Sequence, residues 1–369
     1  MENNRRDWLK KVGLGLAGLS VGQLNTFANT NTIYDDLTVD SNNSRILLRS
    51  NENPYGPSPL AKIAMQKNVG ISNRYGWTLT SELTEVIAKK NHVTKRNVLL
   101  GAGSTEILDL VLRFTALKKG SFIMSETSYS YWTYPAKALG FKKITVPLTK
   151  SKKIDLTAML KSIKADTKMI YICNPNNPTG TICERNELVS FIKEASKKVL
   201  VLVDEAYIEF TNQQSLSNLA IENKNLIVAK TFSKMYGLAG ARIGYAIANE
   251  STINEISKLQ SWPNGSISVV SAAGALASLK DENFKEEVCT KNEKVKKYTI
   301  ENLELLNIKC VPSHSNFIYF SLSNYKKDFF KQLKINNIVG TKIYEEDGKW
   351  SRITIGTIQE MEKFINALK

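Results

Sequence analysis

A lysine, a glycine-rich turn and a lone arginine follow one another in residues 230–245, which read KTFSKMYGLAGARIGY. Lys234 is flanked by small hydroxylated, aromatic and apolar residues, and the stretch contains no acidic residue to pair with it. Such surroundings lower the pKa of an amine, because they withhold water from its charged form. An uncharged lysine amine is a nucleophile that forms Schiff bases with carbonyl compounds. The stretch therefore predicts covalent chemistry at Lys234, with Lys230 as a nearby competitor, if the chain also provides a site for a carbonyl cofactor.

Polar side chains follow the ends of several short apolar runs. Runs at 97–100, 168–173, 199–203 and 225–229 are typical of buried parallel strands, and helical patterns separate them. The polar residues that follow these runs are Ser104, Thr105, Asn177, Asp204, Tyr207 and Lys234. Ligands of parallel α/β sheets bind beyond the carboxyl ends of the strands. We therefore expect these side chains to converge on one crevice.

Two of these strand ends indicate a particular chemistry. Asp204 closes the apolar run VLVLV, and a carboxylate there needs a buried partner, although a helix cap or a surface turn is the alternative. The sequence GAGSTE at 101–106 ends a strand in glycines and opens a helix. Its free backbone N–H groups and the positive end of the helix dipole suit a phosphate.

A larger set of motifs resembles one enzyme family. NENPYG, GAGSTE, NPNNPTG, DEAY, SK followed by GLAGARIGY, NF and RITIGT occur in the order typical of class I and II aminotransferases of pyridoxal phosphate (PLP) fold type I. The resemblance covers about residues 45–360 and is greatest to the histidinol-phosphate aminotransferase branch. It implies PLP as the cofactor and transfer of an amino group between an L-amino acid and a 2-oxo acid.

The resemblance also implies an α/β fold with two domains. A large PLP-binding domain with a mostly parallel seven-stranded sheet is expected at 65–265, and a smaller α/β domain at 266–369. An N-terminal arm at 31–64 is expected to join the small domain. A homodimer with shared sites is implied as well.

Roles in cofactor binding follow from the same resemblance. Lys234 would hold PLP as a Schiff base and later move a proton, and Asp204 would pair with the pyridine nitrogen, which makes the ring an electron sink. Tyr207 and Asn177 would donate hydrogen bonds to the cofactor's phenolic oxygen, although a simple turn is the alternative for Asn177. The residues expected to bind the phosphate are Ser104, Thr105, Thr231 and Arg242, with Tyr75 from the neighbouring subunit.

Further roles concern the cofactor ring and the substrate. Tyr129 would stack on the ring, with Tyr131 and Trp132 as alternatives, because the family usually has Pro-Thr-aromatic where this chain has Thr-Ser-Tyr. Arg352 would clamp the substrate's α-carboxylate through a bidentate pair. Asn316 would assist at the same group, and Tyr55 lies in a segment expected to cover the substrate.

One departure from the family concerns the substrate. Histidinol-phosphate aminotransferases usually carry a second arginine shortly before the carboxylate arginine, and Gly340 stands in its place. Lys342 is a poor replacement, because an ammonium lacks the forked geometry of a guanidinium. This departure predicts an unphosphorylated, aromatic or otherwise neutral amino acid. A true histidinol-phosphate aminotransferase and a PLP-dependent lyase, decarboxylase or racemase remain alternatives, because fold does not set reaction type.

The N-terminus predicts export. NRRDWLK at 4–10 resembles the twin-arginine signature, although Trp8 stands where phenylalanine is usual. A short, glycine-rich apolar stretch follows, and TFA at 26–28 offers small residues for a cleavage site. We expect residues 1–30 to be a signal segment and the protein to be periplasmic, where an enzyme of histidine biosynthesis would be misplaced. Without the signal, the cytoplasm would be its place.

Composition excludes several other classes. The 369 residues carry a formal charge of +15, but the lysines are scattered, and no nucleic-acid-binding motif accompanies them. The four cysteines form no CxxC pair, and the two histidines are far apart in the sequence, so no metal site is expected. The sequence leaves the disulfide state open. Membrane contact is expected only through the export machinery.

Overall fold

The largest sheet has seven strands in the order β2-β8-β7-β6-β5-β3-β4. Strand β8 runs antiparallel to both neighbours, and the other pairs are parallel. This confirms the mostly parallel seven-stranded sheet that we expected. The strands are β2 (Val98–Gly101), β3 (Ser121–Ser125), β4 (Lys142–Val146), β5 (Thr167–Cys173), β6 (Leu200–Asp204), β7 (Leu226–Thr231) and β8 (Gly244–Ala248).

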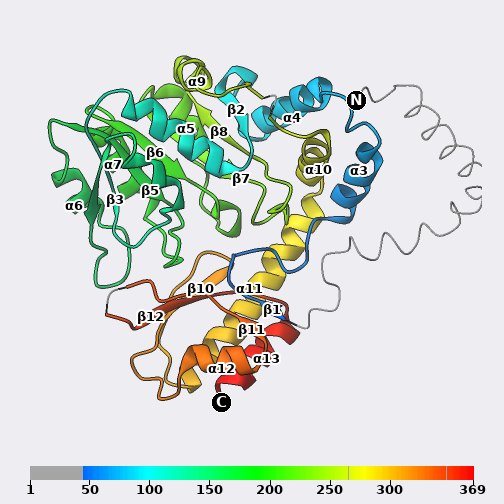
Figure 1. The fold of residues 1–369 in the computed structure, drawn as a ribbon, viewed down its shortest axis with the longest axis vertical. Helices are drawn as coiled ribbons and strands as arrows, with labels where there is room; N and C mark the ends of the chain where they lie inside the picture. The colour runs from blue at the N-terminus through cyan, green and yellow to red at the C-terminus, as the bar shows by residue number, and fades with distance from the viewer. Residues whose placement is uncertain (1–44, 265, 346) are drawn as a thin grey trace, which may run out of the picture. The chain divides into compact units, whose positions relative to one another are not determined.

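The computed structural model describes residues 45–264, 266–345 and 347–369, and residues 46–369 form one compact unit (Figure 1). The predicted signal segment and the first part of the predicted arm lie outside the described residues. None of the helices in the described ranges is long and apolar enough to cross a membrane.

Alternating side chains of the central strands build two hydrophobic cores, one on each face of the sheet. In β6, Leu200 and Leu202 pack into the core that holds α5 and α9, and Val201 and Val203 pack into the core that holds α6, α7 and α8. A strand buried on both faces must be apolar throughout, which explains the unbroken run VLVLV. The helices are α5 (Ser104–Ala116), α6 (Leu156–Lys161), α7 (Arg185–Ala195), α8 (Ser217–Glu222) and α9 (Glu250–Ser257).

The C-terminal part has a smaller sheet with its own core. Strands β9 (Cys310–Val311), β10 (Phe317–Ser321) and β12 (Trp350–Thr354) form an antiparallel sheet in the order β12-β10-β9. Strand β1 (Ile46–Leu47) pairs in parallel with β11 (Ile338–Val339). These elements share a core with helices α11 (Glu282–Leu305), α12 (Phe329–Ile335) and α13 (Ile358–Leu368).

A third group of helices packs around the antiparallel edge of the large sheet. Helix α10 (Val269–Lys280) contacts both α3 (Pro59–Val69) and α4 (Trp77–Lys90), and these helices share a core with β2 and β8. Helices α10 and α11 are separated at Asp281, whose side chain accepts a hydrogen bond from Phe284 N (3.2 Å) at the start of α11. The domain boundaries at 64/65 and 265/266 stay predictions. Short 3-10 helices are η1 (Lys95–Asn97), η2 (Tyr131–Ala136) and η3 (Ile208–Phe210).

Candidate active site

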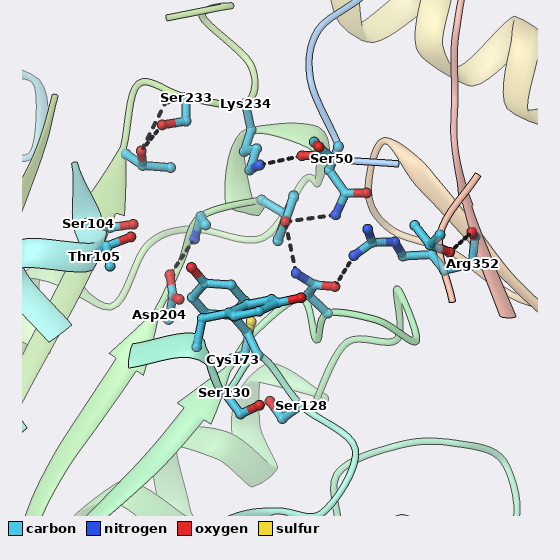
Figure 2. Close-up of a pocket in the computed structure, with 18 of the residues that line it drawn as sticks. Ser50, Ser104, Thr105, Ser128, Ser130, Cys173, Asp204, Ser233, Lys234 and Arg352 are labelled. Carbon is cyan, nitrogen blue, oxygen red and sulfur yellow. Dashed lines mark hydrogen bonds between the residues drawn. The ribbon is translucent and has the colours of Figure 1, made fainter. Parts of the chain in front are cut away.

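A pocket of about 740 Å³ lies beyond the carboxyl ends of the central strands, where the sequence placed the crevice (Figure 2). Its volume is in the range of small-molecule and cofactor sites. The pocket brings together most of the expected cofactor-binding residues, which are Ser104, Thr105, Tyr129, Asn177, Asp204, Tyr207, Thr231, Lys234 and Arg242, and it also includes Arg352.

Lys234 lies three residues beyond β7, with its side chain half-buried in this pocket. Its Nζ donates a hydrogen bond to the backbone oxygen of Ser50 (2.9 Å) and lies 5.9 Å from the centre of the Tyr207 ring. Burial, helped by the nearby positive charge of Arg352, lowers the pKa of Lys234 to about 8. An appreciable fraction of this amine is therefore neutral near pH 7, as the sequence led us to expect.

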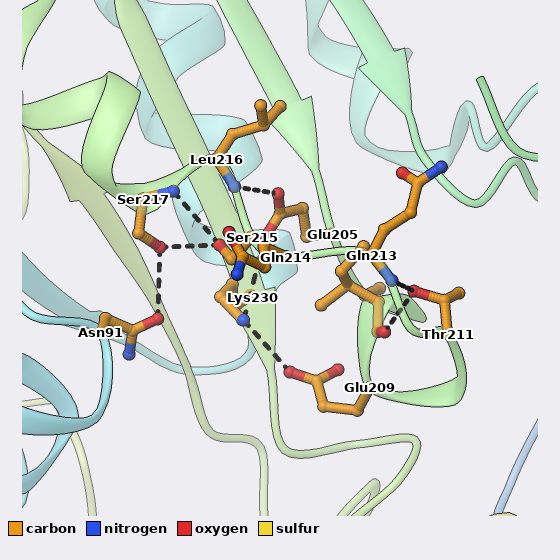
Figure 3. A network of polar contacts seen from close by, with 12 residues as sticks. Asn91, Glu205, Glu209, Thr211, Gln213, Gln214, Ser215, Leu216, Ser217 and Lys230 are labelled. Carbon is orange, nitrogen blue, oxygen red and sulfur yellow. Dashed lines mark hydrogen bonds and ion pairs between the residues drawn. The ribbon is translucent and has the colours of Figure 1, made fainter. Parts of the chain in front are cut away.

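Lys230, the competing lysine, has a different environment (Figure 3). Its Nζ lies 3.3 Å from Glu209 and 3.8 Å from Glu205, and all three side chains are buried. Burial alone would lower the pKa of Lys230, but the facing Glu209, Tyr245 and Glu205 outweigh it and raise the pKa. Because this amine stays charged and paired, it is no candidate for covalent chemistry.

Asp204 is the last residue of β6 and is 3% exposed. Its Oδ2 accepts a hydrogen bond from the Tyr171 hydroxyl (3.0 Å), and its Oδ1 accepts one from Ala206 N (3.1 Å). Burial raises the pKa of Asp204 to about 6, although both hydrogen bonds and the Lys234 amine oppose the shift. A carboxylate so placed would be stabilised by a cationic nitrogen in the pocket, such as a protonated pyridine.

Tyr207, Asn177 and Arg352 form a chain of hydrogen bonds on one wall of the pocket. The Tyr207 hydroxyl accepts from Asn51 Nδ2 (2.9 Å) and from Asn177 Nδ2 (3.3 Å). Arg352 donates from Nη1 to Asn177 Oδ1 and from Nη2 to Arg49 O. The buried Nε of Arg352 has no hydrogen-bond partner in the described residues. An unpaired, charged donor at a pocket wall fits an anionic ligand.

The start of α5 and the Arg242 turn form a second anion-binding feature. Gly103 precedes α5 with φ +80°, and a Cβ there would come within 2.3 Å of Arg242 Nη2. Arg242 itself has φ +51°, which turns its side chain back so that Nη1 donates to Ala239 O (2.9 Å) and lies 3.5 Å from Ser233 Oγ. Helix N–H groups, hydroxyls and a guanidinium therefore meet at one point, and this donor set fits the phosphate of PLP.

The aromatic residues after β3 differ in their placement. Trp132 is 2% exposed and packs in the core between Phe122 and Tyr171, so it cannot stack on a ligand in this pocket. Tyr129 and Tyr131 both line the pocket. Of the three alternatives for the stacking residue, the structure leaves these two.

Three expected residues do not line this pocket. Tyr55 lies in a separate small cleft, where the Lys291 ammonium lies 4.8 Å from its ring centre. Asn316 uses its Nδ2 to hold the backbone oxygens of Asn51 and Glu52 (3.1 and 3.3 Å), so it fixes the segment that contacts Lys234 and Tyr207. Tyr75 is 69% exposed outside the pocket.

Sequence reasoning missed other residues of the pocket wall, among them Arg49, Ser50, Ser233, Thr341 and Tyr344, and it missed Tyr171, which donates a hydrogen bond to Asp204. Ser50 contributes a backbone oxygen, which no side-chain pattern can reveal. A signal existed for Tyr171, because its polar hydroxyl interrupts a buried strand two residues before that strand ends. In the described ranges, no group of three or more His, Cys, Asp or Glu side chains could hold a metal ion.

Comparison with known proteins agrees with this geometry. The family model for "Aminotransferase class I and II" matches residues 43–368. The histidinol-phosphate aminotransferase of Moorella thermoacetica is 33% identical over 330 residues, which cover 88% of this chain and 84% of that protein. That of Caldicellulosiruptor saccharolyticus is 34% identical over 329 residues, covering 88% and 91%.

A solved structure supports the fold. The histidinol-phosphate aminotransferase of Sinorhizobium meliloti, solved in complex with pyridoxal-5'-phosphate, superposes with a TM-score of 0.81 at 23% identity. The superposition covers 93% of this chain and 97% of that one. The fold expected from the sequence motifs is confirmed.

Proposed function

The chain belongs to the class I and II aminotransferases, and we propose that its amino donor is histidinol phosphate and its acceptor a 2-oxo acid. As a member of that family, it is a PLP-dependent aminotransferase. The observation that supports PLP-dependent chemistry in this chain is the pocket in which a desolvated Lys234, a buried Asp204 and an anion-binding helix start meet, and the donor is proposed from the relatives.

Each group of residues in this pocket would have a distinct role in the proposed reaction. Lys234 would hold the cofactor's carbonyl carbon, and its amine, once free, would carry the proton between substrate and cofactor. Asp204 would keep the pyridine nitrogen protonated, and Asn177 and Tyr207 would hydrogen-bond the phenolic oxygen. The phosphate would be held by Arg242, Ser233, Thr231 and the start of α5. When bound, PLP supplies an electron sink for the charge left on the substrate carbon.

We base the proposed donor on the named relatives and not on the glycine at position 340. Both curated relatives named above are histidinol-phosphate aminotransferases at 33–34% identity over most of their length. The unpaired Nε of Arg352 would face the anionic group of the donor, whether that group is a phosphate or a carboxylate.

Gly340 supports a second candidate, an unphosphorylated aromatic amino acid. Gly340 lines the pocket, and a Cβ there would lie 2.5 Å from Leu333 Cδ1, the end of a side chain that can move. Gly340 itself contributes no guanidinium to the wall, and the cations that line the pocket besides Lys234, Arg242 and Arg352 are Lys342 and Arg49.

The test compares donors by kcat/KM with one 2-oxo acid in excess. Histidinol phosphate, histidinol, L-histidine and L-phenylalanine form a series that adds or removes the phosphate and the carboxylate. A preference for histidinol phosphate supports the first candidate, and a preference for L-phenylalanine supports the second. Release of carbon dioxide or loss of stereochemistry without a 2-oxo acid product would instead indicate a decarboxylase or a racemase.

Two further proposals concern assembly and location. We propose a homodimer in which Tyr75 reaches the phosphate of the neighbouring site, and we propose export through the twin-arginine route. The exposed Tyr75 supports the first proposal, and the NRRDWLK sequence supports the second. Replacing Arg5 and Arg6 with lysine should retain the protein in the cytoplasm, which fractionation of cells would measure.

A further inference from the structure

A partly buried ion pair lies next to the substrate side of the pocket. Lys152 Nζ lies 2.8 and 2.6 Å from Glu345 Oε1 and Oε2, and the two side chains are 17% and 19% exposed. Among ion pairs between described residues, only this pair and those of Lys230 have both side chains less than one-fifth exposed. Exposed ion pairs contribute little to stability. An ion pair that is shielded from water and makes two contacts restrains the positions of its two side chains.

Two further contacts hold the Glu345 carboxylate and the Lys152 ammonium. The hydroxyl of the buried Tyr319 donates to Glu345 Oε1 (2.7 Å). The Lys152 ammonium also lies 4.2 Å from the centre of the Trp350 ring, which stacks on Tyr319 with ring centres 5.2 Å apart. Both charges are therefore held by aromatic neighbours as well as by each other.

Each end of this pair is attached to a different wall of the pocket. The backbone oxygen of Lys152 accepts from Thr181 Oγ1 (2.9 Å), which contacts Thr179 Oγ1 (2.7 Å), two residues after Asn177. Glu345 directly follows residues 340–344, of which Gly340, Thr341, Lys342 and Tyr344 line the pocket. The pair therefore connects the turn that carries Asn177 to the segment 340–345.

Tyr344 lines the pocket near Arg352, and through it the Lys152–Glu345 pair would affect the bound donor. Its ring is 5.4 Å from the Arg352 guanidinium carbon and contacts the Tyr319 ring edge-on, with ring centres 6.1 Å apart. Its backbone N donates to Trp350 O (2.9 Å), which extends the β12 edge. Because Glu345 is the next residue, its fixed carboxylate limits where the Tyr344 ring can lie.

We propose that Lys152 and Glu345 are positioning residues that hold segment 340–345, and with it Tyr344, against the donor. This inference rests on the proposed aminotransferase function. The Lys152–Glu345 pair contacts none of the residues that would hold the cofactor ring and reaches the Asn177 turn only through Thr181 and Thr179, so its larger effect falls on donor binding. A contact made equally in the ground state and the transition state changes KM and leaves kcat unchanged.

The test uses Lys152→Met and Glu345→Gln, with Lys152→Arg as the conservative variant. Lys258→Met is the matched control, because it breaks an exposed pair with Glu255 (2.6 Å; 65% and 53% exposed). We expect Lys152→Met and Glu345→Gln to raise the KM of the donor on the order of tenfold, with kcat and PLP affinity within about twofold. Lys152→Arg and Lys258→Met should resemble the wild type.

Hydrogen exchange gives a readout that needs no substrate. The amides of residues 343–351 should exchange several-fold faster in Lys152→Met, because the segment opens locally more often. Unchanged exchange would overturn the inference, as would faster exchange with an unchanged KM. If no donor supports transamination by the wild type, the proposed function fails, and the exchange result still decides whether the Lys152–Glu345 pair holds the segment.

Discussion

The pKa of Lys234 depends on how the residues around it bury its amine. Its amine has an ordinary pKa of 10.5 in water, and burial next to Arg352 brings this pKa to about 8. The sequence predicted the direction of this shift from the neighbouring residues. The partner of the amine, a backbone oxygen 184 residues away, could not be predicted, because it depends on how a distant segment folds over the site.

The lowered pKa predicts the pH dependence of cofactor capture. In the cofactor-free protein, the rate of PLP capture should rise with pH up to about 8 and then level off, because only the neutral amine attacks. The measurement is the initial rate of change of visible absorption after PLP is added. This rate is divided by the rate for a free lysine amine at the same pH. This ratio should be roughly three hundredfold at pH 7 and fall towards pH 10. A ratio independent of pH would contradict a desolvated Lys234.

The buried charge of Asp204 should lower the stability of the cofactor-free protein, although the proposed reaction needs this carboxylate. Its pKa in the folded, cofactor-free protein is about 6, against 3.8 ordinarily, so this group's contribution to stability falls as pH rises from about 4 to 6. Asp204→Asn removes the buried charge while its oxygen can still accept a hydrogen bond. At pH 7, the cofactor-free variant should therefore be more stable, by as much as about 3 kcal/mol. Denaturant unfolding at pH 7 and pH 4 measures this.

The same variant should lose nearly all transamination, because a neutral amide cannot keep the pyridine nitrogen protonated. The gain in stability should vanish near pH 4, where the carboxyl of the wild type is protonated. A variant less stable than the wild type at pH 7 would show that the hydrogen bonds from Tyr171 and Ala206 outweigh the burial of the charge.

At the scale of elements, the junction between β2 and α5 positions the phosphate site. Strand β2 ends at Gly101, α5 begins at Ser104, and Gly103 between them takes a left-handed conformation against Arg242. The sequence predicted this strand, turn and helix, because apolar runs and glycines are local signals. The closeness of Arg242 to Gly103 came from the family resemblance and the structure, because those residues are far apart in the chain.

Gly103→Ala tests this junction, with Gly140→Ala as its control. Both glycines have positive φ, +80° and +64°, so each variant should lose about 1 kcal/mol of stability. Only at position 103 would the new Cβ collide with the Arg242 guanidinium, because nothing lies within 4 Å of a Cβ at 140. We expect PLP affinity to fall at least about tenfold in Gly103→Ala and to stay unchanged in Gly140→Ala. Equal affinities in fluorescence titrations would contradict the phosphate assignment.

At the scale of the whole molecule, an aromatic cluster lies exposed outside the pocket. Tyr75, Trp77 and Trp262 are 69%, 49% and 40% exposed, and their ring centres are 4.7–5.8 Å apart. Clustered exposed aromatic rings are typical of protein interfaces. The motif order predicted the fold, and most of the residues it singled out line one pocket. Long-range pairs such as Arg352–Asn177 needed the structure, since 175 residues separate the partners.

The cluster predicts how the proposed dimer can be broken. Trp77→Glu should shift the protein from dimer to monomer and lower PLP affinity, because Tyr75 would no longer reach the neighbouring site. Leu305→Glu is the control, since Leu305 is 80% exposed outside the aromatic cluster and should leave assembly unchanged. Light scattering after size-exclusion chromatography measures both. A dimeric Trp77→Glu variant with normal PLP affinity would contradict this interface.

The most direct test of the central claim is the visible absorption spectrum of the purified protein and of Lys234→Ala. Our account predicts a yellow wild-type protein whose colour bleaches when the amino donor is added and returns when a 2-oxo acid follows. Lys234→Ala should remain folded, because its Nζ has one hydrogen bond, to Ser50 O, and it should show neither change. A wild-type protein that stays colourless after incubation with PLP, or a Lys234→Ala variant that still turns over, would contradict the account.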